Sequence, residues 1–324
     1  MAARDNIDSL LTSDDPGLRY RTLVRALGKH QASPEVQRVR EAIPSSPRVQ
    51  AMLSLRDESG QIPYGPYTKW FGSHWTLAEL AELGYPPGDE SLLPLREQVL
   101  GWLLGARHWK SIRTLDGRVR RCASQEALAV YSLLTLGLAD ERVDELVSRL
   151  LRWQWPDGGW NCDKHPEAVN SSFMETLIPL RALSLYAQTT GSAEVKEATK
   201  RAAEIFLKRR LYKRVADGTV MRREFVELHY PCYWHYDILF GLKVMAEAGF
   251  IHDPRCQDAL DLLEAKQLPS GGFPAEARYY RTTGALKTGR SLVDWGGVNK
   301  RRMNEWVTAD ALYVLRVSGR RPCP

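Results

Sequence analysis

The sequence has no long hydrophobic run. No stretch of about 18 apolar residues occurs among its 324 residues, which argues against a transmembrane helix. The first residues, MAARDNIDSLLTSDD, carry acids where a secretory signal would need an apolar block. We therefore expect a cytoplasmic protein without a transmembrane segment.

Disulfide and metal-binding patterns are also missing. Five cysteines are an odd number scattered over a large chain, which favours free thiols or ligands over a disulfide framework. No CxxC or HxxxH spacing is present. The net charge of +6 is modest and the basic clusters are short, so we expect solvated surface charge and no nucleic-acid partner.

Strand signals are scarce, and a recurring unit built around a glycine turn takes their place. The clearest turns are QWPDGGW (154–160) and QLPSGGF (267–273), with weaker versions at 56–63, 113–120 and 214–221. The last glycine of each turn recurs every 42 to 59 residues, at Gly60, Gly117, Gly159, Gly218 and Gly272. A period of this size predicts a repeat architecture.

Each unit predicts a helical hairpin. An amphipathic segment such as 140–153 precedes the turn, and a more apolar helix such as 171–186 follows it. Because the units vary in length and the second helices are the more apolar, we expect an all-α protein closed into an α/α toroid of about five to six hairpins. The toroid would span residues 51–324, with an N-terminal helical region (1–50) packed on it. The second helices would start near His74, Cys122, Ser171, Trp234 and Asn304, with their N-termini around one mouth of a central cavity.

Four motifs carry a family resemblance. QWPDGGW resembles the QxxDGGW repeat of the squalene–hopene cyclases, whose superfamily also contains the β-subunits of protein prenyltransferases. RRCAS, QWPDGGWNCD, LHYPCYWHYD and NEWVTADAL are similar to bacterial single-toroid proteins with prenyltransferase or squalene-oxidase repeats. The resemblance implies an α/α toroid and a structural role for Gln154, Asp157 and Trp160. It leaves the chemistry to be argued separately, because one fold hosts many functions.

The expected helix N-termini supply the candidate site residues. Backbone amides and helix dipoles there favour anions and lower thiol and carboxyl pKa values. The acid–base candidates are Asp163, Glu175, His235, Asp237 and Glu305. Aromatic faces stabilise cations, and the candidate substrate-binding residues are Trp70, His74, Trp75, Arg121, Cys122, Tyr230, Tyr233, Trp234, Trp295 and Trp306.

The leading hypothesis is an enzyme of the terpene-cyclase type, an isomerase or lyase. It would cyclise or isomerise an isoprenoid-like small molecule by acid initiation in an aromatic-lined cavity. The cyclase pattern DxDDTA is missing, since NEWVTADAL places Trp306 and Val307 where the aspartates would stand. Another acid is therefore required, such as Asp163 or Asp237.

Two alternatives stay open. The first is a zinc- or thiol-dependent transferase that uses Cys122, Cys162 and His235, although the zinc ligands of the prenyltransferases do not carry over. The second is a toroid that binds a lipid, a glycan or a protein partner, or that acts on carbohydrate. The leading hypothesis expects no cofactor, and zinc belongs to the first alternative; the chain is expected to be a monomer or homodimer. The stretch 278–303 is long, basic and glycine-rich. This composition is typical of a loop that covers the mouth of the cavity and meets an anionic group such as a diphosphate, and equally of a mobile surface loop.

Overall fold

The computed structural model describes the backbone of residues 2–320 and the side chains of residues 6–320. This part of the chain is mostly helical, as the sequence predicts. Its strands form one two-stranded antiparallel hairpin, β1 (Arg113–Leu115) with β2 (Arg118–Arg120). Among the described residues, no helix is both long and apolar enough to pass through a lipid bilayer.

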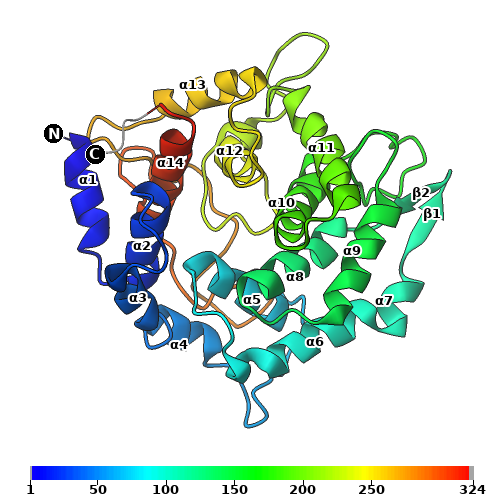
Figure 1. The fold of residues 1–324 in the computed structure, drawn as a ribbon, viewed down its shortest axis with the longest axis horizontal. Helices are drawn as coiled ribbons and strands as arrows, with labels where there is room; N and C mark the ends of the chain where they lie inside the picture. Colours follow the sequence, from blue (N-terminus) through cyan, green and yellow to red (C-terminus); the bar gives the residue numbers. More distant parts are fainter. Residues whose placement is uncertain (1, 321–324) are drawn as a thin grey trace.

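The helices form two sets (Figure 1). The inner helices surround the middle of the molecule and are α5 (Ser73–Leu83), α8 (Ala123–Thr135), α10 (Phe173–Thr190), α12 (Ile238–Glu247) and α14 (Glu305–Val317). The outer helices lie around them and include α4 (Pro47–Leu53), α6 (Leu93–Leu104), α7 (Ala106–Lys110), α9 (Glu141–Trp153), α11 (Ala193–Leu207) and α13 (Gln257–Ala265). Short 3-10 segments, η2 (Glu90–Leu92), η3 (Arg223–Val226) and η4 (Pro254–Cys256), join some of them.

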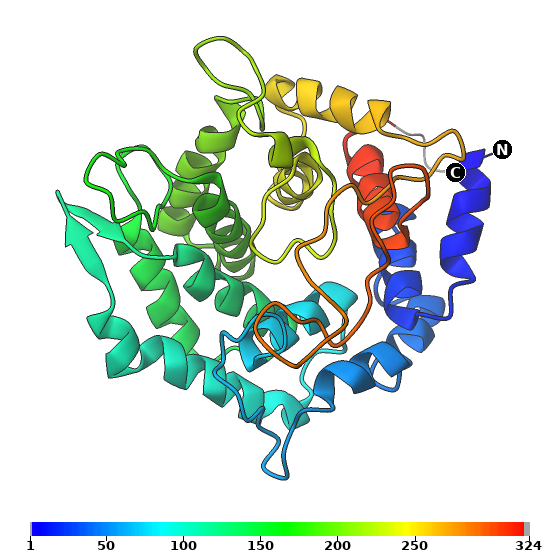
Figure 2. The same ribbon diagram turned by 180° about the vertical axis from the view of Figure 1, so that it is seen from behind.

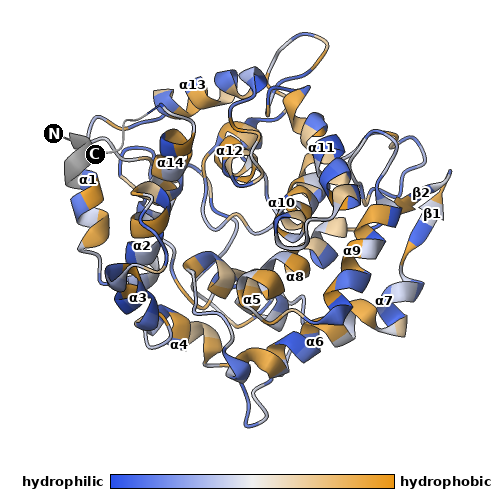
Figure 3. Ribbon diagram, in the orientation of Figure 1, coloured by the Kyte–Doolittle hydropathy of each residue, from blue (hydrophilic) through white to orange (hydrophobic). Residues whose placement is uncertain are grey.

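Burial explains why the two sets differ in sequence. Helix α9 buries Val143, Leu146, Val147 and Leu150 on one face. Its charged residues other than Arg149 are not buried, and the helix therefore shows both colours in Figure 3. Helix α10 is covered on nearly all sides and is buried from Phe173 through Ser184 except at Met174. A helix that is covered on nearly all sides carries mostly apolar residues around its whole circumference. The charged residues that α10 buries, Glu175 and Arg181, have polar partners.

The N-terminal region completes the inner set. It contains α1 (Ala2–Leu11), α2 (Pro16–Arg21), the π-helix η1 (Thr22–Ala26) and α3 (Pro34–Glu41). Helix α2 and η1 pack beside α14, and Arg316 Nε donates a hydrogen bond of 2.8 Å to the carbonyl oxygen of Arg25. The N-terminal region and the last helix therefore meet, and α2 brings Arg21 to the buried ion pair with Asp310 of α14.

The QWPDGGW turn joins neighbouring helices. Gln154 Nε2 donates to the carbonyl oxygens of Gly158 and Ala198, both at 2.8 Å, and so links the turn to α11. Gly158 has a φ of 108°, and a side chain there would clash with the backbone of α11. Trp160 Nε1 donates to Leu150 O of α9 at 3.0 Å. These contacts account for the polar residues of the turn without any catalytic role.

The segment 278–303 crosses one mouth of the inner helices (Figure 2). It is held there by Trp70, whose backbone N–H donates to Arg290 O at 3.0 Å and whose ring N–H donates to Tyr279 O at 2.9 Å. Trp295 of this segment is buried and reaches the centre of the molecule. We call residues 278–303 the covering segment.

Candidate active site

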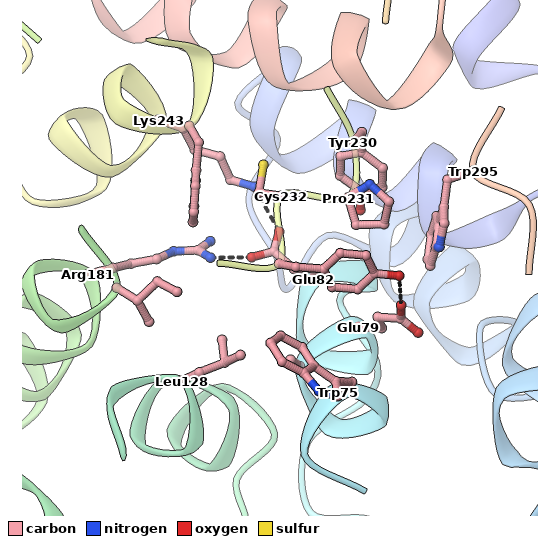
Figure 4. A pocket seen from close by; sticks show the side chains of 14 residues that line it. Trp75, Glu79, Glu82, Leu128, Arg181, Tyr230, Pro231, Cys232, Lys243 and Trp295 are labelled. Carbon is pink, nitrogen blue, oxygen red and sulfur yellow. Dashed lines mark hydrogen bonds and ion pairs between the residues drawn. The ribbon is translucent and has the colours of Figure 1, made fainter. Parts of the chain in front are cut away.

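A small cavity lies between the inner helices (Figure 4). Its volume is about 40 Å³, which is room for roughly three water molecules. Aromatic side chains form one part of the wall, and charged groups form another. The aromatic residues are Trp75, Tyr230, Tyr233, Phe240 and Trp295, and the charged ones are Glu79, Glu82, Arg181 and Lys243.

One face of α5 organises the cavity. Trp75, Glu79 and Glu82 follow one another at helical spacing, which places them on the same side of the helix. Opposite α5 lie Arg181 of α10 and Lys243 of α12. The remaining wall comes from the stretch before α12 and from the covering segment.

The aromatic wall is made of contacting rings in two layers. Trp70 stacks on Tyr233 with ring centroids 3.7 Å apart and planes 7° from parallel. Trp75 meets both rings edge-on, at 4.6 and 5.5 Å. Tyr230 packs against Trp295 and stacks on Trp306. Four predicted substrate-binding residues therefore line the cavity, Trp75, Tyr230, Tyr233 and Trp295, while Trp70 and Trp306 support them from behind.

Glu79 is a buried carboxyl group at the aromatic end of the cavity. Its Oε1 accepts a hydrogen bond of 2.8 Å from the hydroxyl of Tyr233. Burial raises the pKa of Glu79 to about 8 and outweighs the opposing effects of Tyr233 and Arg48. At neutral pH the group is therefore mostly protonated and can donate a proton. The sequence argument missed Glu79, although an acid inside the apolar stretch SHWTLAELAEL is a readable signal.

Glu82 lies one turn further along α5 in a different environment. Its Oε2 is 2.8 Å from Lys243 Nζ and 3.2 Å from Arg21 Nη1, and its Oε1 pairs with Arg181. Burial alone would raise its pKa, but Arg181, Lys243 and Arg21 together lower the pKa of Glu82 well below its usual range. Glu82 is therefore a carboxylate at neutral pH and is not available as an acid.

These ion pairs belong to a larger buried network. Arg181 Nε lies 2.6 Å from Glu247 Oε2, and Lys243 Nζ lies 3.1 Å from Asp310 Oδ2. Arg21 also pairs with Asp310. Beyond the network is a larger hollow of about 450 Å³, and Glu82 and Arg181 line both spaces. The network therefore forms a charged floor between the cavity and the opposite mouth.

The structure places Asp237 and His235 outside the cavity lining defined by the described residues. Asp237 caps α12, since its Oδ1 accepts from Phe240 N at 2.8 Å, and its Oδ2 lies 2.8 Å from His229 Nδ1. His235 is stacked between Trp234 and Tyr279, at 4.0 and 3.7 Å. Burial lowers the pKa of His235 to about 3, which leaves it neutral.

Two other predicted acids lie at the surface. Asp163 is exposed in the loop after the QWPDGGW turn, where its Oδ1 accepts from His165 N at 2.9 Å. Glu305 is exposed in the first turn of α14. Both carboxyl groups are in contact with water, so the cavity cannot shift their charge. A turn accounts for Asp163, and the N-terminus of α14 accounts for Glu305. Neither belongs to the cavity lining.

The remaining predicted acid, Glu175, lies with two cysteines. The sulfur atoms of Cys122 and Cys162 and a carboxylate oxygen of Glu175 all lie within 4.8 Å of one another. Burial raises the pKa of Glu175. His235, predicted as the third metal ligand, is not part of this group. The group shares no residue with the cavity lining, so the two sites are separate.

His74 and Arg121, two further predicted binding residues, also lie outside the cavity lining. His74 is buried among the rings of Tyr67, Trp75 and Trp102, and burial lowers its pKa to about 3. Within residues 6–320 its ring nitrogens have no hydrogen-bond partner. Arg121 Nη2 lies 2.8 Å from His108 Nε2, and His108 in turn contacts the buried carboxylate of Glu126.

No family model and no curated protein sequence matches this chain. The fold and the site define a mostly helical protein whose centre holds a buried carboxyl group with a raised pKa, an aromatic wall and an ion-paired floor.

Proposed function

We propose that this chain is an enzyme built as an α/α toroid like the squalene–hopene cyclases, and that it isomerises or cyclises an unsaturated, isoprenoid-like substrate in the central cavity. The inner and outer sets of helices in Figure 1 support the toroid. The observation that carries the chemistry is Glu79, a buried acid with a pKa of about 8 that faces an aromatic wall. Enzymes tune carboxyl groups in this way when an acid must work near neutral pH.

Glu79 would both give and recover the proton. The protonated carboxyl group transfers its proton to one carbon of a substrate double bond, whose π electrons form the new C–H bond. The adjacent carbon becomes a carbocation, which rearranges or is attacked by a second double bond. Loss of a proton from a neighbouring carbon to the Glu79 carboxylate then forms the product double bond and restores the acid.

The wall suits a cationic intermediate. The rings of Trp75, Tyr233 and Trp295 line the cavity, and aromatic rings attract cations through the negative potential of their faces. Cys232, which lines the cavity, stays a thiol because burial raises its pKa well above the usual value. Lys243 is engaged by two carboxylates. The Glu82 carboxylate also lines the cavity, but it is ion-paired with Lys243, which makes it a weaker nucleophile toward a carbocation.

Substrate entry would require the covering segment to move. The cavity of about 40 Å³ is far smaller than the ~300–1,000 Å³ of typical ligand pockets. Trp295 belongs both to the covering segment and to the cavity wall. Lifting this segment would enlarge the cavity and open it to the mouth, and its return would exclude water from the cation.

The test compares the parent protein with Glu79→Gln in deuterated buffer, using linear isoprenoid hydrocarbons, alcohols and diphosphates of increasing chain length. We expect the parent to form isomerised or cyclised products with deuterium at one new C–H bond. The Glu79→Gln variant should turn over about 100-fold more slowly or worse. Glu305→Gln, at the surface, is the matched control and should behave as the parent does.

Two outcomes would contradict the proposal. If Glu79→Gln retains turnover, Glu79 is not the acid, and Asp237→Asn then tests the acid that the sequence favoured. If the parent binds these compounds but forms no product under any condition, a binding protein explains the cavity better.

A further inference from the structure

A second group of reactive side chains lies outside the central cavity. Cys122 is the residue before α8, Cys162 follows the QWPDGGW turn, and Glu175 lies in the first turn of α10. The fold brings one atom from each within 4.8 Å of the others. Cys162 Sγ lies 3.4 Å from Glu175 Oε1. Three parts of the chain therefore converge on one point.

The distances fit a tetrahedral ion. Zinc holds thiolate sulfur at about 2.3 Å and carboxylate oxygen at about 2.0–2.2 Å, so a sulfur and an oxygen on one ion lie roughly 3.5 Å apart. The Cys162–Glu175 contact already has this length. The other ligand atoms need to approach one another by no more than about 1 Å, which is within the reach of side-chain rotation. Paired thiolates also favour zinc over magnesium or calcium.

Glu175 distinguishes this group from a simple pair of thiols. Its Oε2 accepts a hydrogen bond of 3.1 Å from the backbone N–H of Ser124, which directs Oε1 toward Cys162. Glu175 is 9% exposed, whereas both cysteines are half-buried. A disulfide does not require a buried carboxylate beside it. A zinc site does use a third ligand of this kind, and the backbone N–H of Ser124 would be the outer partner that orients it.

We propose that Cys122, Cys162 and Glu175 bind one zinc ion through three protein ligands, with a fourth position for water or for a sulfur or oxygen atom of a substrate. Three protein ligands and one exchangeable position are the form of a catalytic zinc site. Arg121 and Gln125 lie close to Cys122 in the sequence and line a groove of about 740 Å³ together with Tyr67. The proposal does not depend on the chemistry of Glu79, because the two sites share no lining residue.

The test uses the full chain, reduced and freed of metal with a chelator, and Co²⁺ as a spectroscopic probe. We expect one equivalent of Co²⁺ to produce intense near-ultraviolet bands from thiolate coordination, and one equivalent of Zn²⁺ to remove them. Cys122→Ser and Cys162→Ser should each weaken the affinity for Co²⁺ at least about tenfold, and Glu175→Gln should do the same. Cys232→Ser, a cysteine of the central cavity, is the control and should bind as the parent does.

Circular dichroism of each metal-free variant shows whether it is folded, so that a loss of binding is not mistaken for unfolding. Co²⁺ spectra without thiolate bands would overturn the proposal, and so would equal binding by the parent and by a folded double variant, Cys122→Ser with Cys162→Ser. A Cys122–Cys162 disulfide that resists treatment with excess reductant would also overturn it. Since none of these measurements uses turnover, their failure is distinct from a failure of the Glu79 proposal.

Discussion

The two ends of the central cavity each hold a glutamate, and the two glutamates differ in protonation state. Glu79 and Glu82 lie one turn apart on α5, and both line the cavity. Glu79 faces aromatic rings and one hydroxyl group, and burial raises its pKa to about 8. Glu82 faces Arg181, Lys243 and Arg21, which lower its pKa well below the usual range.

The comparison shows what sets the role of a buried carboxyl group. Glu79 is buried and Glu82 is partly buried, so loss of water favours the neutral form of each. At the floor, several cations reverse this preference, and the charges hold α5, α10 and α12 together. Within residues 6–320 Glu79 has no ion pair at the aromatic end, and burial keeps its proton in place. One helix face thus supplies a structural anion and a candidate acid.

The largest expected effect tests the floor. Arg181→Met removes the partner of both Glu82 and Glu247 and leaves buried carboxylates without their main cation. We expect the free energy of unfolding to fall by about 3–5 kcal/mol, measured by urea denaturation. Arg152→Met is the control, because Arg152 is 59% exposed and its contact with Glu145 is 3.6 Å; it should cost less than about 1 kcal/mol. Equal losses in the two variants would show that the floor contributes no special stability.

The second prediction separates the two glutamates by pH. In the folded chain Glu79 has a pKa of about 8, above its ordinary value of 4.5. Between these values the folded state keeps a proton that the unfolded state has lost. The free energy of unfolding therefore falls as pH rises, by at most about 1.4 kcal/mol per pH unit from this group. Glu79→Gln should remove that slope, measured by urea unfolding over a pH series.

Glu82 should show the opposite sign. Its folded pKa is lowered, so its contribution to stability is present above the ordinary value of 4.5 and is lost as the pH falls below it. Glu82→Gln should reduce the stability at neutral pH and weaken the loss on acidification, in contrast to Glu79→Gln. If both variants change the free energy of unfolding in the same pH range, the assignment of a neutral Glu79 and an ionised Glu82 is wrong.

The smallest effect tests the hydroxyl group beside the acid. Tyr233→Phe removes the donor to Glu79 Oε1 and keeps the ring that stacks on Trp70. We expect a loss of about 1 kcal/mol in the free energy of unfolding. Because the hydrogen bond opposes the rise in the pKa of Glu79, its removal should shift the alkaline limb of a pH–rate profile to higher pH.

Tyr186→Phe is the matched control for this variant. Tyr186 donates to Asp144 at 2.8 Å and is not part of the cavity lining. It should leave the profile unchanged. A profile that does not move in Tyr233→Phe would mean that Glu79 does not set the alkaline limb.

Helix positions were largely predictable because their signals are local. The inner helices were expected near His74, Cys122, Ser171, Trp234 and Asn304, and they begin at Ser73, Ala123, Phe173, Ile238 and Glu305. Helix α12 begins four residues later than Trp234 because Asp237 is its N-cap. Periodicity and glycine turns are readable within a few residues of chain, so they locate helices without knowledge of distant contacts.

The site residues were predictable only in part. Four of the expected aromatic wall residues line the cavity, since large aromatic side chains in a helical repeat have few other places to be buried. The acids were chosen at helix N-termini, where Asp237 serves as a cap and Glu305 is exposed. A better signal was a charged residue inside an apolar helix, as at Glu82, Arg181, Lys243 and Asp310.

By itself the sequence determined that the chain is mostly helical, where the inner helices begin, and that the QWPDGGW turn is bound to its neighbours. The tertiary structure decided which acid keeps a proton and which thiols meet a carboxylate. Tyr233 lies 154 positions from Glu79, and Lys243 lies 161 positions from Glu82. A pKa depends on the charges and the solvent within a few ångströms of a group, and distant parts of the chain supply those neighbours only after folding.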